Sequence, residues 1–300
     1  MKKLTLLLTL LLSQHSFSGD FQCTPQQTIE WKELEEGVLW TKYDLSFTPY
    51  NKENHIWEDS KNRSVTVRAF KVDVLKNKLL FHRSNKDLEC TPGKNRYIHQ
   101  LVDDSGAKII GAINASFFVM PNGKIQGVAI DENKMWSNDL NSQTISSSGV
   151  LSIENGETTL QTKEEFIARF GPIMTQEDAL KLSFAVQAYP KLLINNLLQI
   201  GDGVLNSKRS RTSIGTNDIP NEIVLVTIDA RGESDKTGMT LYEYAHFLNK
   251  ADCGVSQKTA LNLDGGGSSA FAIPSMNIYE QADQCRHLGN ILTIQRRISI

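Results

Sequence analysis

One run of the chain, residues 222–229, is apolar at almost every position, and it restricts the folds open to this sequence. A strand that is apolar on both sides must be covered by protein on both sides. Residues 65–74 alternate apolar and polar side chains and are predicted to be a strand, and residues 108–114 are predicted to be another. We therefore expect a layered structure in which residues 222–229 form an inner strand.

Helix signals occur between the predicted strands. Capping boxes at Thr162 and Thr240, each with a glutamate three residues later, predict helices over residues 163–170 and 241–250, and a further helix is expected over 176–182. An Asn-Gly pair at 155–156 predicts a hairpin of residues 149–153 and 157–160. Pro190 interrupts two expected strands, 184–189 and 191–194. This mixture predicts an α+β fold, a mixed β-sheet core with packed helices.

The first residues have the form of an export signal. Two lysines precede an apolar run at residues 4–12, and Ser16-Phe17-Ser18 has the small-x-small pattern that signal peptidase reads. We expect residues 1–18 to be removed and the mature protein to be exported, to the periplasm or outside the cell, with no membrane anchor. Residues 19–104 are an unassigned N-terminal region of strands and a loop. Within it, residues 22–63 give the weakest signal and are interpreted as edge strands plus a loop at 49–61. Apart from Cys23 and Cys90, residues 105–300 hold every candidate site residue described below.

The four cysteines are Cys23, Cys90, Cys253 and Cys285. An even number in an oxidising compartment favours two disulfides, and buried free thiols are the alternative. Three pairings can be drawn, and the entropy of loop closure does not choose among them. Closeness along the chain favours Cys23 with Cys90 and Cys253 with Cys285.

The segment 260–271, Ala-Leu-Asn-Leu-Asp-Gly-Gly-Gly-Ser-Ser-Ala-Phe, has the highest density of reactive and ligand-binding residues. In a strand, Asn262 and Asp264 share one face. Three glycines follow and can direct successive N–H groups at one point, and two serines can add hydroxyl donors. These residues, Gly265, Gly266, Gly267, Ser268 and Ser269, predict an anion site beside a carboxylate. A turn capped by Asp264 is the alternative, although a two-residue turn needs fewer glycines.

Other predicted strands also end in polar residues. The amide of Asn114 is suited to a sugar hydroxyl or a phosphate oxygen, or to local backbone. Arg209 and Arg211 alternate and can share a face, either as phosphate ligands or as a solvated basic edge. Asp229 ends the apolar strand beside Arg231, and is either a catalytic carboxylate or a turn residue with an ion-pair partner.

Several classes of protein are disfavoured. The chain has no His-x-x-x-His or Cys-x-x-Cys spacing, no Gly-x-Ser-x-Gly elbow and no Walker loop. We therefore predict no cofactor, and no pattern supports a divalent cation. The formal net charge of -2 gives no indication of a nucleic-acid partner.

Taken in order, eight segments resemble the phosphodiester glycosidase family, and the likeness covers about residues 105 to 295. The segments are 112–118, 127–130, 187–192, 209–215, 225–231, 238–241, 261–269, and Arg286 with Gly289-Asn290. The resemblance implies a hydrolase that cleaves the anomeric C–O bond of a sugar 1-phosphodiester, in a pocket lined by Asn114, Arg211, Asp229, Asp264 with its glycines, and Arg286. Tyr189 stands where a glycine is usual in the family.

The residues suit that reaction, because a phosphate monoester with a second pKa of about 6 leaves without full protonation. Anion-binding groups then stabilise the leaving phosphate, and a carboxylate stabilises the sugar cation or activates water. Asp264 is the first candidate and Asp229 the second. The expected partner is a small-molecule or glycan phosphodiester. Two alternatives are a metal-dependent phosphodiesterase with both aspartates as cation ligands, and a non-catalytic binder of anionic envelope polysaccharide.

Overall fold

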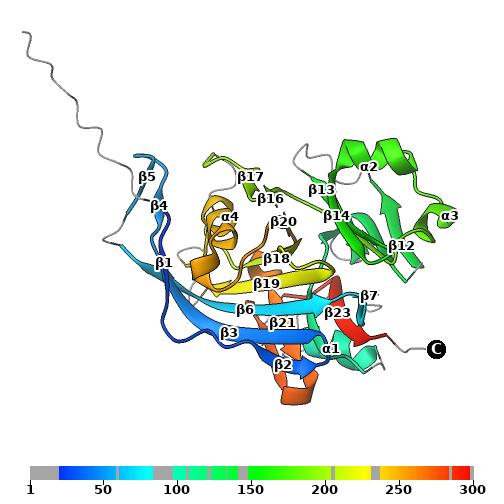
Figure 1. Cartoon of the computed structure of the whole chain (residues 1–300), viewed down its shortest axis with the longest axis horizontal. Coiled ribbons are helices and arrows are strands. Elements are labelled where there is room, and N and C mark those ends of the chain that lie inside the picture. The colour runs from blue at the N-terminus through cyan, green and yellow to red at the C-terminus, as the bar shows by residue number, and fades with distance from the viewer. Residues whose placement is uncertain are drawn as a thin grey trace, which may run out of the picture.

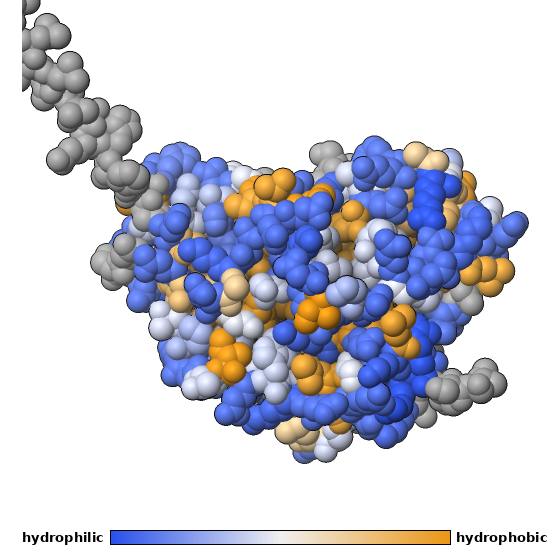
Figure 2. Space-filling model, viewed as in Figure 1, coloured by the Kyte–Doolittle hydropathy of each residue, from blue (hydrophilic) through white to orange (hydrophobic). Residues whose placement is uncertain are grey.

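The structure, a computed structural model, describes residues 20–58, 61–83, 97–105, 108–119, 123–132, 134–140, 148–203, 207–230, 237–283 and 286–297. The predicted signal segment 1–18 lies outside the described residues, as do Cys90, Arg231 and Cys285. Within the described part, no helix is long and apolar enough to cross a membrane. The face seen in Figure 2 is mostly hydrophilic, with apolar side chains in separate groups.

A nine-stranded sheet, here called the large sheet, forms the middle of the molecule (Figure 1). Its order is β1-β3-β6-β19-β18-β20-β16-β17, and β2 also pairs with β3. The strands are β1 (Cys23–Pro25), β2 (Lys32–Glu35), β3 (Val38–Phe47), β6 (Arg63–Asp73), β16 (Lys191–Ile194), β17 (Leu197–Leu198), β18 (Arg211–Thr216), β19 (Glu222–Ala230) and β20 (Thr259–Asn262).

Two five-stranded sheets complete the fold. The β8 sheet has the order β22 (Ile278–Gln281), β21 (Ala270–Ile273), β8 (Gly111–Asn114), β23 (Asn290–Arg296) and β7 (Asn77–Arg83). The β15 sheet has the order β12 (Lys134–Asp139), β11 (Gly127–Asp131), β15 (Phe184–Ala188), β13 (Gly149–Glu154) and β14 (Glu157–Thr162). Short hairpins join β4 (Tyr50–Asn51) to β5 (Ile56–Trp57), and β9 (Phe118–Val119) to β10 (Lys124–Ile125).

Helices are few in the described residues. They are α1 (Tyr97–Asp104), α2 (Lys163–Phe170), α3 (Gln176–Ala179) and α4 (Leu241–Asn249), with short 3-10 turns η1 (Ala251–Cys253), η2 (Gly266–Ser268) and η3 (Pro274–Met276). The predicted α+β fold is therefore confirmed only in part, because strands dominate the structure. The expectation of a mixed sheet is wrong: every strand pair in the described residues is antiparallel. Neighbours such as β13 and β14 are joined by tight turns, which parallel neighbours cannot use.

Strand β19 is buried on both faces, as its sequence predicts. On one face Leu225 packs with Phe70 of β6 and with Phe271 of the β8 sheet. On the other face Val226 packs with Phe247 of α4. The large sheet thus lies between α4 and the two smaller sheets, and each fully buried apolar side chain adds roughly 1.5–3 kcal/mol of stability.

Residues 22–63 contribute an inner strand, which corrects the expectation that they form only edge strands and a loop. Strand β3 pairs with β6 over its whole length, from Val38 opposite Val72 to Phe47 opposite Arg63. Strand β6 in turn pairs with β19. The sequence of β3 alternates over its second half, where Tyr43, Leu45 and Phe47 are buried and the residues between them are polar, so a strand could be predicted there. Its inner place depends on pairing with β1, β2 and β6, which lie next to it only in the folded chain.

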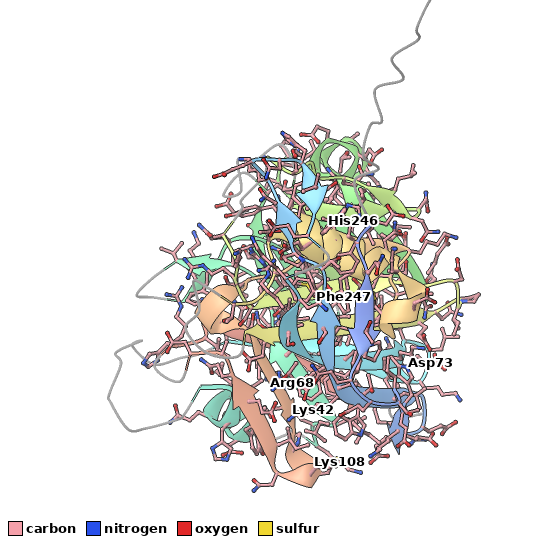
Figure 3. All side chains as sticks on the ribbon, turned by 90° about the vertical axis from the view of Figure 1, so that its left-hand side faces the viewer. Lys42, Arg68, Asp73, Lys108, His246 and Phe247 are labelled. Carbon is pink, nitrogen blue, oxygen red and sulfur yellow. A yellow bond between two sulfur atoms is a disulfide. The ribbon has the colours of Figure 1, made fainter. Side chains whose placement is uncertain are left out.

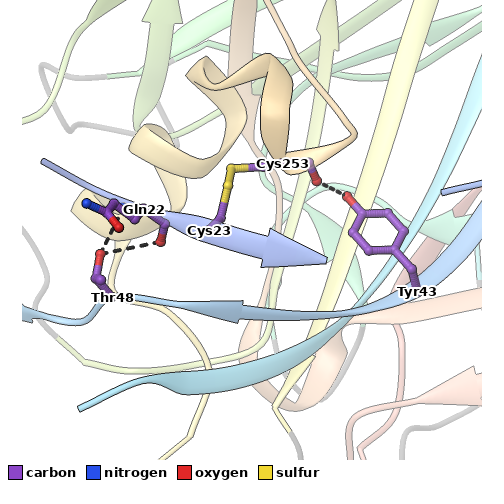
Figure 4. Close-up of a disulfide and its surroundings, with 5 residues drawn as sticks. All are labelled: Gln22, Cys23, Tyr43, Thr48 and Cys253. Atoms are coloured by element: carbon purple, nitrogen blue, oxygen red, sulfur yellow. Dashed lines mark hydrogen bonds between the residues drawn. A yellow bond between two sulfur atoms is a disulfide. The ribbon is translucent and has the colours of Figure 1, made fainter. Parts of the chain in front are cut away.

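The disulfide joins Cys23 to Cys253, with their Cα atoms 5.7 Å apart, so the pairing expected from chain proximity is wrong (Figure 4). Strand β1 pairs with β3, and Tyr43 of β3 donates its hydroxyl hydrogen to the carbonyl of Cys253. Gln22, next to Cys23, is tied to Thr48 by a backbone N–H bond of 2.9 Å to the Thr48 hydroxyl. Tertiary packing places β1 beside η1, and this contact determines the partner.

Removing this disulfide is expected to reduce the free energy of unfolding by about 2–5 kcal/mol, because it closes a loop with a sequence separation of 230 residues. The measurement is denaturant unfolding of the double variant Cys23→Ser/Cys253→Ser against the parent under oxidising conditions. Under reducing conditions the difference between the two proteins should largely disappear. Equal stability when oxidised would contradict the expectation.

Candidate active site

The glycine segment predicted from the sequence links two sheets. Strand β20 of the large sheet ends at Asn262, and β21 of the β8 sheet begins at Ala270. The chain between them is tightly packed: a Cβ on Gly265 would lie 3.1 Å from the Ser210 carbonyl oxygen, and one on Gly267 would lie 2.8 Å from the Cβ of Asp283. Gly266 has a φ of 61°, which L side chains rarely adopt. Glycine is thus required here for close approach and for backbone conformation.

Most backbone N–H groups of this segment donate to oxygen atoms of the protein and are not free to bind a ligand. Gly265 donates to the Asp264 carboxylate at 2.9 Å, and Gly266 donates to the Ser210 carbonyl at 2.8 Å. Ser268 and Ser269 donate to the carbonyls of Gly265 and Gly266 at 3.2 and 3.1 Å. Residues 265–269, here called the glycine bend, are therefore not a row of amides that all point at one external anion. Anion binding by Gly265, Gly266 and Gly267 stays a prediction.

Asn114, at the end of β8, holds Asp264 in place. Its side-chain amide donates to the Asp264 carbonyl at 2.6 Å, and its oxygen accepts bonds from the Thr212 hydroxyl at 2.8 Å and from the Ala270 N–H at 3.0 Å. The Asp264 N–H donates to the Ala115 carbonyl at 3.1 Å. Asn114 is 1% exposed, so these bonds form in a dry interior. Its amide serves backbone, as one interpretation had it, but that backbone lies 150 residues away.

The Asp264 carboxyl group has an unusual environment. Burial raises its pKa above that of an ordinary aspartate, while the Ser268 hydroxyl, the Gly265 N–H and the positive charge of Arg286 lower it. A carboxyl group whose pKa is shifted by burial and by a neighbouring charge is a candidate functional group. The charge of Arg286 thus reaches Asp264, and a Cβ on Gly267 would be 3.4 Å from the Cβ of Arg286. The roles that the resemblance implied for the two residues stay predictions.

Arg211 and Arg209 behave differently. Arg211 is buried on the α4 side of the large sheet, where its Nε donates to the Met239 carbonyl at 2.9 Å and its Nη2 donates to the Ser207 carbonyl. Burial lowers its pKa to about 10. Its neighbour Thr212 faces the other way, toward Asn114, so the structure does not bring Arg211 and Asn114 together. Arg209 is the arginine at the bend: its Cδ is 3.9 Å from where a Cβ on Gly266 would be.

Asp229 lies on the face of the large sheet that meets the β8 sheet. It accepts a bond of 3.4 Å from the Ser210 hydroxyl, and Arg68 Nη2 is 3.8 Å from its carboxylate. Ser210 also accepts the Gly266 N–H, so one residue joins Asp229 to the bend. Asp229 and Ser269 line a small cavity of about 10 Å³.

The cation beside Asp229 is one that the sequence interpretation missed. Arg68 of β6 is opposite Lys42 of β3 (Figure 3). Both form ion pairs with Glu280 of β22. The side chain of Arg68 is 8% exposed, so its charge needs these acidic partners. An arginine at an otherwise buried strand position was the available signal, but only the sheet order shows that it reaches Asp229.

Asn262 positions a neighbouring loop. Its amide donates to the Tyr189 carbonyl at 2.8 Å, and its side-chain oxygen is buried with no hydrogen-bond partner in the described residues. The ring of Tyr189 stacks on Phe117, with centroids 4.5 Å apart, and both burial and the charge of Asp264 raise the pKa of Tyr189. Both residues lie in segments that resemble the family, Tyr189 at a position where a glycine is usual, and the sequence did not predict their contact.

The described residues contain no group of three or more His, Cys, Asp or Glu side chains arranged to hold a metal ion.

Comparison with known proteins identifies the family of this chain. The model of the phosphodiester glycosidase family matches residues 107–295. The bovine and human N-acetylglucosamine-1-phosphodiester alpha-N-acetylglucosaminidases are each 34% identical over 95 residues, which is 32% of this chain and 16% and 17% of theirs. The catalytic domain of the zebrafish N-acetylglucosamine-1-phosphodiester alpha-N-acetylglucosaminidase, auto-inhibited by pro-peptide, has a similar fold, with a TM-score of 0.62 at 17% identity over 93% of this chain and 89% of that one.

A hypothetical protein from Synechocystis also shares the fold, with a TM-score of 0.56 at 14% identity over 90% of this chain and 64% of that one. The family match extends over more than half of the chain and includes the motifs of the candidate site. This chain belongs to the phosphodiester glycosidase family.

Proposed function

We propose that this protein is an exported phosphodiester glycosidase that hydrolyses the anomeric C–O bond of a sugar 1-phosphodiester, of the N-acetylglucosamine 1-phosphodiester kind. The observation that supports this most is the position of Asp264: Asn114 holds its backbone carbonyl, the Gly265 N–H bonds its carboxylate, and the charge of Arg286 acts on that carboxylate. A fixed carboxylate next to a positive charge suits a reaction that develops positive charge on a sugar and negative charge on a phosphate. The names of the similar proteins support the same substrate class.

In this mechanism the sugar C1–O bond breaks and its oxygen stays with phosphorus. Asp264 stabilises the oxocarbenium-like sugar or takes a proton from the attacking water, whose oxygen becomes the new hydroxyl at C1. Arg286 stabilises the charge of the departing phosphate monoester. Arg209, at the glycine bend, is a further phosphate ligand, and Asp229, joined to the bend through Ser210, is the second carboxylate.

Export is part of the proposal for two reasons. The leader sequence has the pattern of a cleaved signal. The Cys23–Cys253 disulfide is of a kind that persists in oxidising compartments. The expected substrate is therefore a glycan or small molecule of the envelope or the extracellular space that has a phosphodiester at the anomeric carbon.

The test is incubation of the purified protein with methyl N-acetylglucosamine 1-phosphodiester in ¹⁸O-labelled water, followed by mass analysis of both products. The proposal expects the label in the sugar. Label in the phosphate, with activity lost on chelation, would indicate a metal-dependent phosphodiesterase instead. Ligand binding without any product would indicate a binding module.

The pH dependence of the rate gives a prediction about Arg286. If Asp264 acts as a carboxylate, kcat/KM falls as the pH drops through its pKa, and burial places this fall at a higher pH than for an exposed aspartate. The charge of Arg286 lowers that pKa, so Arg286→Gln is expected to move the acidic limb to higher pH and to lower the plateau about 100-fold. The measurement is the pH profile of kcat/KM.

Arg296→Gln is the matched control, since Arg296 pairs with Glu36 at the surface. Its profile should coincide with that of the parent. If the acidic limb of Arg286→Gln stays in place or moves to lower pH, the charge of Arg286 does not lower the pKa of the group that limits the rate, and the prediction is wrong.

A further inference from the structure

Two aromatic rings lie together beside Asp264. The rings of Phe117 and Tyr189 are nearly parallel, with centroids 4.5 Å apart and an angle of 18° between them. Phe117 follows β8 of the β8 sheet. Tyr189 lies between β15 of the β15 sheet and β16 of the large sheet, so the contact links segments that leave all three sheets. Each residue is only partly buried, so part of the pair is open to a ligand.

The pair is fixed to the same backbone as the carboxylate. Asn262, two residues before Asp264, holds the Tyr189 carbonyl at 2.8 Å. Asp264 donates its N–H to Ala115, two residues before Phe117, and Phe117 accepts the Gln126 N–H at 2.8 Å. Burial and, after it, the charge of Asp264 raise the pKa of Tyr189, which agrees with the placement that these backbone bonds give. The rings are thus preorganised relative to the group that we propose for chemistry.

The cationic part of the site uses the next residue in the chain. Phe118 lies against Gly289, where an added Cβ would be 2.3 Å from the ring, and the Arg286 guanidinium carbon is 5.9 Å from the centre of that ring. Adjacent residues therefore have different partners: Phe117 stacks on Tyr189, and Phe118 packs beside Arg286. Asp264 thus has the Phe117–Tyr189 pair on the aromatic part of the site and Arg286 on the cationic part.

We propose, on the basis of the function proposed above, that the Phe117–Tyr189 pair binds the sugar ring of the substrate and sets the specificity for it, while Arg286 binds the phosphate. A pyranose has an apolar face of C–H groups with a slight positive charge, which packs well on the negative face of an aromatic ring. A phosphodiester anion is repelled by that face and by Asp264, and pairs with arginine. The substrate class is then a pyranoside with an uninterrupted C–H face.

Product inhibition separates the two halves of the site. N-acetylglucosamine should inhibit the Tyr189→Leu protein about 10- to 100-fold more weakly than the parent, since an aromatic contact is lost. Inhibition by inorganic phosphate should change less than threefold. Arg286→Gln should show the opposite pattern. Tyr189→Phe keeps the aromatic ring, so the sugar should inhibit this variant nearly as strongly as it inhibits the parent.

The matched control is Tyr279→Leu, because the Tyr279 ring packs on His99 of α1, with centroids 4.4 Å apart. It should leave both inhibition constants unchanged. Thermal unfolding of all variants checks the fold, and Phe117→Leu replaces Tyr189→Leu if the latter does not fold. A parent that releases no sugar would overturn the proposed function. A parent that releases sugar, with Tyr189→Leu and Phe117→Leu inhibited normally by N-acetylglucosamine, would overturn this inference alone.

Discussion

Asp264→Asn is expected to lower kcat by about three to four orders of magnitude and to leave the fold intact. The asparagine side chain has the same shape, and its oxygen still accepts the Gly265 N–H that Asp264 accepts at 2.9 Å. The backbone bonds to Asn114 and Ala115 do not involve the side chain and remain. What is lost is the negative charge, which stabilises the sugar cation or activates water.

The measurement is kcat on an N-acetylglucosamine 1-phosphodiester, with thermal unfolding as a check on the fold. Asp229→Asn is expected to have a smaller effect, because Asp229 is the second carboxylate. Asp218→Asn is the control, since Asp218 is 82% exposed and pairs only with Lys258 among the ion pairs of the described residues, at the far end of β18. A near-native kcat for Asp264→Asn would remove Asp264 from the chemistry. A larger loss in Asp229→Asn would exchange the two roles.

Glu243→Ala is expected to reduce the free energy of unfolding by about 3–5 kcal/mol. Glu243 is fully buried and accepts three contacts: an ion pair with Arg63, the Tyr50 N–H at 2.8 Å and the Thr240 N–H at 2.8 Å. Its removal leaves the Arg63 charge, whose side chain is 15% exposed, without its carboxylate. It also removes half of the capping box that begins α4.

Glu165→Ala is the matched control. Glu165 occupies the same capping-box position in α2 and accepts the Thr162 N–H at 2.8 Å, but this bond is exposed. Its loss should reduce the stability by about 1 kcal/mol or less. Both variants are compared by urea denaturation. Equal losses would show that the buried ion pair adds nothing beyond the cap.

The parts of the fold that were predicted correctly depend on residues near each other in the chain. The capping boxes of α2 and α4 form as expected, because the cap and its partner are three residues apart. The turn between β13 and β14 has positive φ angles at Asn155 and Gly156, which those residue types adopt easily. Helix α3 is shorter than predicted, ending at Ala179, since tertiary contacts decide where a weak helix stops.

The candidate site was predicted less completely. Asp264 and the glycines lie together because they belong to one segment, and Arg286, which the resemblance named, lies near Gly267. Their roles stay predictions. Arg211 does not join them: the side chains of β18 alternate, and the strand is registered so that Thr212, not Arg211, faces Asn114. Register depends on the neighbouring strands and could not be read from residues 209–215 alone.

By itself, the sequence determined the buried character of β19, the helix caps, the need for glycine at the bend and the family. The tertiary structure alone decided the antiparallel order of the sheets, the pairing of Cys23 with Cys253, the contact of Arg68 with Asp229 and the stacking of Tyr189 on Phe117. The physical reason is that local signals act through backbone conformation over a few residues. Contacts between distant residues depend on how whole apolar faces pack, and many pairings satisfy the same local pattern equally well.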